Sequence, residues 1–216
     1  YEVSRALAAC EGALLVVDAS QGIEAQTIAN TLLAMEYDLE LIPVLNKVDL
    51  PQAEPERVAG EIEQAFGFRH DEILYVSAKE GTGAKEILDA VIDRIPAPKG
   101  DVNSSPRSLV FDSEYNSYKG IIAYVRVKDG IISKSDRIKV MSSGRVAEIV
   151  EVGVFAPGPT PTDSLGTGQV GYIATGFKEV RDCSVGDTLT VAQSPATEAL
   201  SGYFPLKSMV FAGLYP

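Results

Sequence analysis

The hydrophobic positions in the first hundred residues follow two alternating patterns. Short apolar runs, each ending in a polar residue, are typical of buried strands and cover residues 14–17, 41–45 and 73–76. Around them, apolar residues recur at helical spacing over residues 2–10, 23–35, 56–66 and 83–95. This αβαβαβα order predicts a parallel sheet with right-handed crossovers and flanking helices. Pro43, inside the second run, is a misfit because proline cannot donate to a strand ladder.

The pattern changes after residue 106 to short β-rich runs separated by Gly, Pro and Asp turns. These runs cover residues 108–111, 120–127, 137–141, 146–155, 169–174 and 188–191. Strands of this length and spacing are typical of a small closed β-barrel. The segment 97–106 is rich in Pro, Gly and Ser and predicts a linker. We therefore expect an α/β domain over residues 1–96 and a barrel over residues 107–192.

Charge divides the chain at the same place. Residues 1–106 carry 8 basic and 19 acidic side chains, net −11, whereas residues 107–216 carry 11 of each. No apolar run reaches the roughly 20 residues of a membrane span. Cys10 and Cys183 lack metal-ligand spacing, and we expect both to stay reduced. These observations predict a cytoplasmic protein of two domains, with no metal site in this chain.

Two short motifs follow the second and third apolar runs. NKVD covers residues 46–49, and SAK covers residues 77–79. An ionised carboxylate can accept both the N1–H and the 2-amino group of guanine, and Asp49 has this chemistry. Adenine offers no such pair, so it would leave a buried Asp49 desolvated and unpaired. Specificity for guanine is therefore expected to depend mainly on Asp49.

The other motif residues suit further contacts to a purine. Asn46 can brace the base and the loops through its amide, the alkyl stem of Lys47 can lie along the purine face, and the backbone N–H of Ala78 can donate to the guanine oxygen. Ser77 and Lys79 complete the predicted pocket. The alternative is a strand-to-helix turn capped by Asp49 and an ordinary helix start at SAK. The position at the carboxyl ends of strands, where open α/β sheets bind ligands, favours the pocket.

Longer phrases resemble the translational GTPases, and most closely the LepA family, also called elongation factor 4. They are YEVSRALAACEGALLVVDASQGIEAQT at 1–27, DSEYNSYKGIIAYVRVKDGII at 112–132, VGYIATGFKEVRDCSVGDTLT at 170–190 and VFAGLYP at 210–216. The barrel phrases resemble LepA more than elongation factor G, elongation factor Tu or BipA. The resemblance implies the C-terminal half of a P-loop-type G domain, followed by a domain II barrel. Residues 193–216 would then be a linker and the start of domain III.

The resemblance also implies an activity and partners. These are ribosome-dependent GTP hydrolysis during elongation, GTP or GDP as ligand, Mg²⁺ in the complete protein, and the ribosome, through its RNA and proteins, as partner. DNA is not an expected partner. Cytoplasmic location is implied, and the resemblance leaves room for peripheral association with the inner face of the cell membrane.

The sequence departs from the family at its catalytic parts. The family's phosphate loop, GxxxxGK followed by Ser or Thr, does not occur in these 216 residues. The family's catalytic histidine is expected upstream of Tyr1, and the single histidine, His70, is expected on a solvated surface. We therefore expect a fragment with no catalytic residue of its own, inactive alone. The alternatives are a non-catalytic module that binds the ribosome, or a different translational GTPase such as BipA or elongation factor G.

Basic residues gather between positions 119 and 145, against Asp129 and Asp136. They are Lys119, Arg126, Lys128, Lys134, Arg137, Lys139 and Arg145, and the local net charge is +5. Alternating strands place basic side chains on one solvated face in any case, so a structural role is an open alternative. The resemblance, with domain II meeting ribosomal RNA, favours Lys119, Arg126 and Lys128 as residues that face phosphates.

Overall fold

The chain forms two compact units in a computed structural model that describes residues 2–179 and 182–201. The units are Tyr1–Pro98 and Lys99–Pro216. No helix within the described ranges is long and apolar enough to cross a membrane. The predicted start of domain III falls mostly on residues 202–216, which lie outside the described residues.

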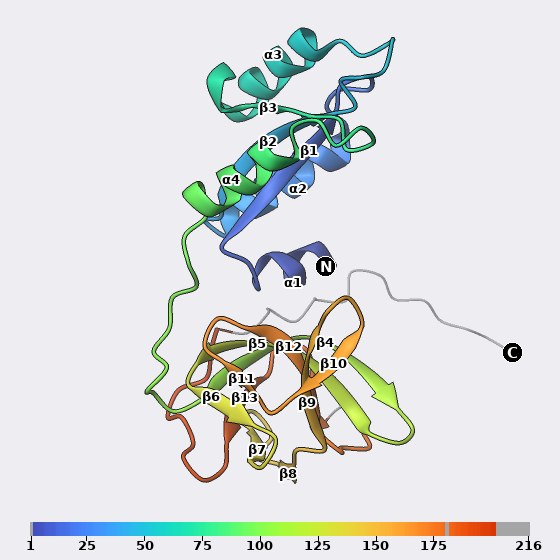
Figure 1. Cartoon of the computed structure of the whole chain (residues 1–216). Coiled ribbons are helices and arrows are strands. Elements are labelled where there is room, and N and C mark those ends of the chain that lie inside the picture. Colours follow the sequence, from blue (N-terminus) through green and yellow to red (C-terminus); the bar gives the residue numbers. More distant parts are fainter. Residues whose placement is uncertain (1, 180–181, 202–216) are drawn as a thin grey trace, which may run out of the picture. The chain divides into compact units, whose positions relative to one another are not determined.

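The first unit is a parallel sheet with helices packed against it (Figure 1). The sheet has the order β1-β2-β3, with β1 at Gly12–Asp18, β2 at Glu40–Asn46 and β3 at Leu74–Tyr75. The helices are α1 (Glu2–Leu7), α2 (Ala25–Glu36), α3 (Pro55–Phe66), the 3-10 helix η1 (His70–Glu72) and α4 (Ala84–Arg94). The predicted α/β alternation is confirmed. Helix α1 ends three residues earlier than expected because the N–H groups of Ala9 and Cys10 bond to carbonyls three residues back.

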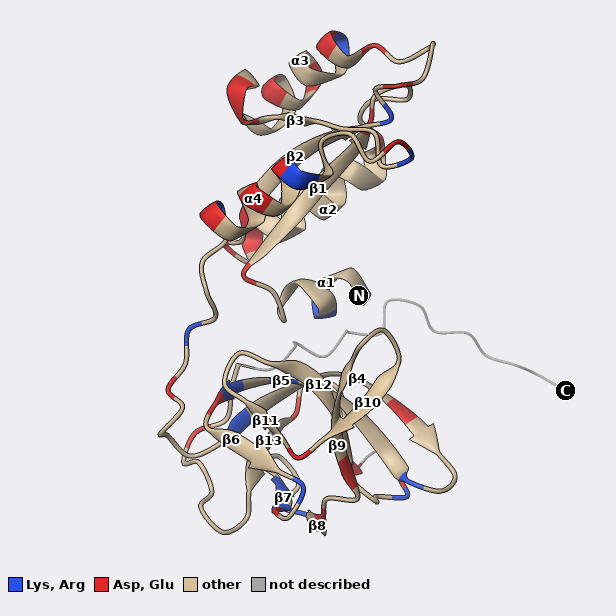
Figure 2. Cartoon of the chain, in the orientation of Figure 1, with Lys and Arg blue, Asp and Glu red and all other residues tan. Residues whose placement is uncertain are grey.

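Strand β2 separates two apolar layers. Leu45 packs with residues of α3, including Val58 and Ile62. Ile42 and Val44 point to the opposite face, as alternate strand residues do, and pack against α4. Acidic residues recur along both α3 and α4 (Figure 2). Pro43 lies within this central strand, and the β2–β3 ladder begins at Val44, directly after it.

Strand β1 has an uncovered apolar face. Leu14 and Val16 are the register partners of Ile42 and Val44 and therefore share the face that α4 covers over β2. Over β1, however, these side chains are 40% and 54% exposed. Strand β1 is also an edge strand, because it pairs only with β2 in the described part of the chain. Unpaired backbone groups beside exposed apolar side chains favour association with another chain.

The isolated 216-residue chain is therefore expected to self-associate at concentrations on the order of tens of micromolar. Val16→Lys should reduce the association, because a charge on an edge strand opposes pairing. Light scattering measures the mass of the species in solution. The matched control is Tyr118→Lys, which adds the same charge at a 95% exposed position of the second unit and should change nothing. A monodisperse monomer for the unsubstituted chain would contradict the expectation.

The second unit is an antiparallel β-domain with a main apolar core and a smaller apolar cluster. Its larger sheet has the order β10-β9-β12-β5-β4-β13-β7-β8, and β11 pairs with β6. The strands are β4 (Arg107–Asn116), β5 (Gly120–Asp129), β6 (Ile131–Ser133), β7 (Arg137–Val140), β8 (Val146–Glu148), β9 (Glu151–Phe155), β10 (Pro159–Thr162), β11 (Ser164–Gly166), β12 (Val170–Ala174) and β13 (Thr188–Val191).

Alternation along β5 fills both faces of the sheet. Ile121, Ala123 and Val125 point into the main core, whereas Ile122 and Tyr124 join an outer cluster. In the outer cluster Tyr124 meets Phe155 edge-to-face, with ring centroids 5.4 Å apart. The prediction of a small β-rich barrel domain is confirmed in its strand content and antiparallel pairing.

The strand boundaries correct the sequence prediction in two ways. The predicted strand at 146–155 is two strands, because Ile149 turns into the core while Val150 is exposed and donates its N–H to Ala174. Strands β6, β10 and β11 were not predicted. Strand β10 contains Pro159 and Pro161, and it is tolerated because it lies at the edge of the sheet.

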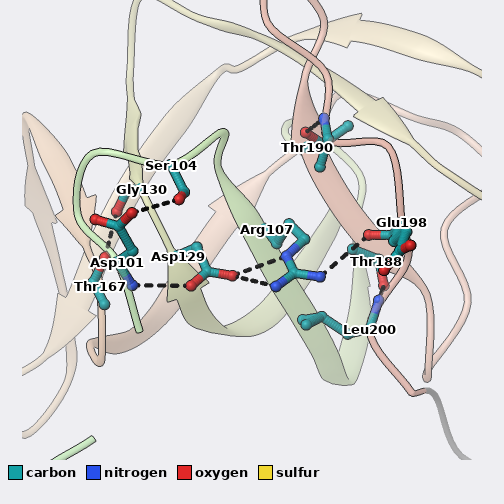
Figure 3. Close-up of polar contacts among 11 residues, drawn as sticks. Asp101, Ser104, Arg107, Asp129, Gly130, Thr167, Thr188, Thr190, Glu198 and Leu200 are labelled. Carbon is teal, nitrogen blue, oxygen red and sulfur yellow. Dashed lines mark hydrogen bonds and ion pairs between the residues drawn. The ribbon is translucent and has the colours of Figure 1, made fainter. Parts of the chain in front are cut away.

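The chain enters the second unit through a polar cluster around Asp129 (Figure 3). One carboxylate oxygen of Asp129 accepts the N–H of Asp101 at 3.0 Å, and the other accepts Nε of Arg107 at 2.8 Å. Burial opposes ionisation of Asp129, but these donors outweigh it, so its pKa lies below the ordinary value. Part of the segment predicted as a linker is thus bound to the barrel domain.

The same cluster holds the outgoing chain (Figure 3). Arg107 donates from Nη1 to the backbone oxygen of Glu198 at 3.4 Å. The buried hydroxyls of Thr190 and Thr188 accept the N–H groups of Ala196 and Leu200 at 3.0 and 2.9 Å. We call the residues Asp101, Arg107, Asp129 and Glu198 the Asp129 clasp, because they join the incoming and outgoing segments.

Candidate functional site

The loops that carry the two sequence motifs meet at the carboxyl edge of the parallel sheet. Asp18 ends β1 and is the register partner of Asn46, which ends β2. Val76, just after β3, donates its N–H to Leu45 at 2.9 Å and accepts the N–H of Val48 at 3.3 Å. These bonds bring NKVD and SAK side by side, as the sequence predicts.

Asn46 joins the two motifs directly. Its Oδ1 accepts the backbone N–H of Lys47 at 2.8 Å and the backbone N–H of Ala78 at 3.0 Å. Asn46 therefore joins the two loops, whereas its predicted contact to a base stays a prediction. The N–H of Ala78 was expected to donate to a guanine oxygen, but here it donates to Asn46. A base at this site would have to share or replace that bond.

Lys47 has an unusual backbone conformation and an anchored side chain. Its φ is +66°, in the left-handed region, which costs a non-glycine residue about 1–2 kcal/mol. Its Nζ lies 2.6 Å from Oδ2 of Asp18. Strain of this kind is often found at functional sites. Sequence reasoning did not single out Asp18, although its place at the end of an apolar run was visible.

The carboxylate of Asp18 is held on both sides. Its Oδ1 accepts the N–H and the hydroxyl of Ser20 at 2.8 and 2.6 Å. Lys47 and then Ser20 lower the pKa of Asp18 to about 2, against a smaller opposing effect of burial. The group is therefore ionised at any physiological pH and forms a fixed negative charge beside the motif loops.

Asp49 lies in the turn after Lys47 and is half-buried. Within the described residues, no hydrogen-bond donor or cation pairs with its carboxylate. Carboxylates in partly desolvated positions are normally paired, so an unused acceptor here suits a ligand that presents donors. That Asp49 accepts the donor edge of guanine stays a prediction.

The SAK loop is shaped by Ser77 and a glycine. Ser77 is buried, donates its N–H to Thr82 at 3.0 Å, and accepts the N–H of Glu80 at Oγ at 3.3 Å. Gly83 has φ +78°, and a Cβ there would lie 2.8 Å from the carbonyl oxygen of Tyr75. Ser77 therefore has a local structural role, whereas Lys79 is exposed on the loop surface.

The structure rearranges the predicted basic stripe. Lys119 forms an ion pair with Glu151 at 2.7 Å. Arg126 is only 8% exposed, which corrects its predicted place on a solvated face. Strand β5 is central there, so Arg126 has register partners on both sides, Leu109 and Val170. Lys128 is half-buried and is the better candidate for a phosphate contact.

The described residues hold no group of three or more His, Cys, Asp or Glu side chains that could bind a metal ion. His70 was expected to be solvated. Its side chain is half exposed, but its Nδ1 lies 2.5 Å from Oε1 of Glu63, and its Nε2 lies 3.4 Å from Glu56.

Two family models match the chain. The model described as elongation factor Tu GTP binding domain matches residues 1–97, and the model described as elongation factor Tu domain 2 matches residues 120–190. The first match covers the sheet with NKVD and SAK, and the second lies within the barrel domain.

Curated relatives match over the whole chain. Elongation factor 4 of Thermotoga maritima is 56% identical over 216 residues, which is 100% of this chain and 35% of that protein. Elongation factor 4 of Thermobifida fusca is 55% identical over the same length, again 35% of that protein. The corresponding protein of Thermosynechococcus vestitus is 56% identical and covered to 36%. The chain thus spans about a third of the length of the curated relatives it matches.

A solved structure supports the fold. Translation elongation factor SelB from Methanococcus maripaludis, in complex with the GTP analogue GPPNHP, matches with a TM-score of 0.69 and 20% sequence identity. The match covers 88% of this chain and 43% of that one. At this identity the likeness concerns the fold alone.

Proposed function

Because the chain belongs to the translational GTPases, and all 216 of its residues match elongation factor 4, we propose that it forms the guanine-recognising part and domain II of a ribosome-associated GTP hydrolase. The observation that carries the proposal is the half-buried Asp49 carboxylate, which no described residue pairs with. Asn46 joins the two loops beside it. The hydrolytic step itself is assigned to the full-length protein.

Asp49, Asn46 and Lys47 have different roles in the recognition of guanine. Asp49 accepts the N1–H and 2-amino group of guanine, and this contact excludes adenine. Asn46 keeps the NKVD and SAK loops together. The stem of Lys47 lies against the purine face. Magnesium would neutralise phosphate charge during hydrolysis in the full-length protein.

Competition binding tests the proposal. The full-length protein should bind a fluorescent GDP derivative, and GTP should displace it while ATP at the same concentration should not. The discrimination should be large, because ATP would leave the Asp49 carboxylate desolvated and unpaired. Displacement by ATP as readily as by GTP would reject guanine recognition.

The ribosome is proposed as the partner of the barrel domain, with cytoplasmic location; peripheral membrane association stays a prediction. Lys128→Glu in the full-length protein should weaken ribosome binding and lower the salt-dependence slope by about 1. Sedimentation with ribosomes over a salt series measures both. Lys178→Glu, at an exposed position outside the stripe, is the matched control. An unchanged slope for Lys128→Glu would assign the stripe to ordinary solvated surface.

A further inference from the structure

The ion pair between Asp18 and Lys47 joins two elements of the site that are far apart in sequence. Asp18 comes from the end of β1, and Lys47 follows the end of β2. The two residues meet because the parallel register places Asp18 beside Asn46. The side chain of Asp18 is 17% exposed and that of Lys47 is 52% exposed, so the anchor is the more buried partner.

The geometry of Asp18 suits an anchor better than a catalytic group. Ser20 binds Oδ1 through two hydrogen bonds, which fixes the carboxylate plane and leaves Oδ2 for the ammonium of Lys47. The other end of Lys47 is fixed too, since its backbone is in the left-handed region and its N–H donates to Asn46. The four-carbon stem is thus tethered at both ends.

We propose that Asp18 is a positioning residue of the guanine site, which acts by holding the ammonium of Lys47 so that the stem of Lys47 forms a fixed platform for the purine face. The proposal rests on the proposed function, because it assigns a role to Asp18 within the same nucleotide site. A free lysine stem would lose conformational entropy each time a base bound. A stem ordered before binding loses less, so affinity rises without a new contact to the ligand.

The proposal separates affinity from specificity. The stem of Lys47 meets the face of the purine, which guanine and xanthine share. Asp49 meets the edge at which these bases differ. Asp18→Asn should therefore weaken GDP and GTP by the same factor and leave the preference for guanine over xanthine unchanged. If Asp18 instead acted through the phosphates, Asp18→Asn would weaken the binding of GTP and of GDP by different factors.

The test is a binding comparison in the full-length protein with fluorescent GDP. Asp18→Asn keeps an oxygen that can accept from Ser20, so the turn after β1 is retained while the charge is lost. Binding should weaken by about three- to tenfold, the range for a charged hydrogen bond partly screened by solvent. The matched control is Asp89→Asn, which breaks an ion pair of the same 2.6 Å length with Lys85 on α4. It should bind GDP normally.

A double substitution shows whether Asp18 acts through Lys47. Lys47→Met keeps an unbranched apolar stem and removes the ammonium, so it should weaken GDP binding to the same extent as Asp18→Asn. The double variant should be no weaker than either single variant, because both remove one interaction. Thermal unfolding of each variant checks that the fold is retained.

The outcomes are distinct. Normal GDP binding by Asp18→Asn overturns the proposal, and so does a full additional loss when Asp18→Asn is combined with Lys47→Met. Failure of the unsubstituted protein to bind GDP would instead contradict the proposed function. Equal losses in the single variants, no further loss in the double variant and an unaffected Asp89→Asn would support the anchor.

Discussion

Replacing Asp49 by asparagine is expected to turn a GTP-preferring protein into one that prefers XTP. The substitution removes a charged acceptor and presents an amide donor where guanine also presents donors. GTP then loses a charge-assisted pair of about 1.5–3 kcal/mol, or roughly 10- to 100-fold in affinity. Xanthine carries a carbonyl in place of the 2-amino group, so the new amide has a partner.

Competition between GTP and XTP for the full-length protein measures this change directly. Asp93→Asn is the matched control, because it removes the same charge from an exposed position of α4, outside the site. The control should keep the GTP preference. If Asp49→Asn keeps it as well, Asp49 is a structural cap of its turn and the guanine pocket is wrongly assigned.

The isolated 216-residue chain is expected to release no phosphate from GTP above background, even with ribosomes present. Phosphoryl transfer depends on groups that position the phosphates and stabilise their charge, and the GxxxxGK motif with its Ser or Thr is not among these residues. The full-length protein, assayed beside it, should show ribosome-stimulated turnover. Circular dichroism checks that the isolated chain is folded, so that a lack of activity cannot be attributed to unfolding.

Two results would change this assignment. Turnover by the purified isolated chain would mean that catalytic groups lie within its own residues. A full-length protein that binds GDP and ribosomes but does not hydrolyse GTP would favour the alternative of a non-catalytic ribosome-binding module.

Sequence reasoning predicted the elements whose signal is local. Apolar runs and helical spacing located the parallel sheet, because each run is a continuous stretch of apolar residues, although only residues 41–45 are buried throughout. Strands β6 and β11 are too short for periodicity to show, and they are held by pairing with each other. The burial of Arg126 was also hidden, since it depends on neighbours that β4 and β12 supply.

In the candidate site too, the local motifs could be predicted, whereas the contacts between separate strands and loops could not. NKVD and SAK are contiguous motifs with specific chemistry, so Asn46, Lys47 and Asp49 could be proposed from sequence. The tether between Asp18 and Lys47 depends on the register of two strands, which no local pattern encodes. The hydrogen bond from the Ala78 N–H to Asn46 could not be predicted either, because the two loops meet only when the sheet has folded.

The Asp129 clasp determines how the barrel domain would carry mechanical load. Asp129 holds the incoming chain at Asp101, and its partner Arg107 holds the outgoing chain at Glu198. A pulling force applied to the chain on both sides of the barrel would therefore pass across this short polar bridge. The ends of β4 and β5, which carry Arg107 and Asp129, and strand β13, which binds Ala196 and Leu200, would bear this tension before the rest of the sheet of domain II.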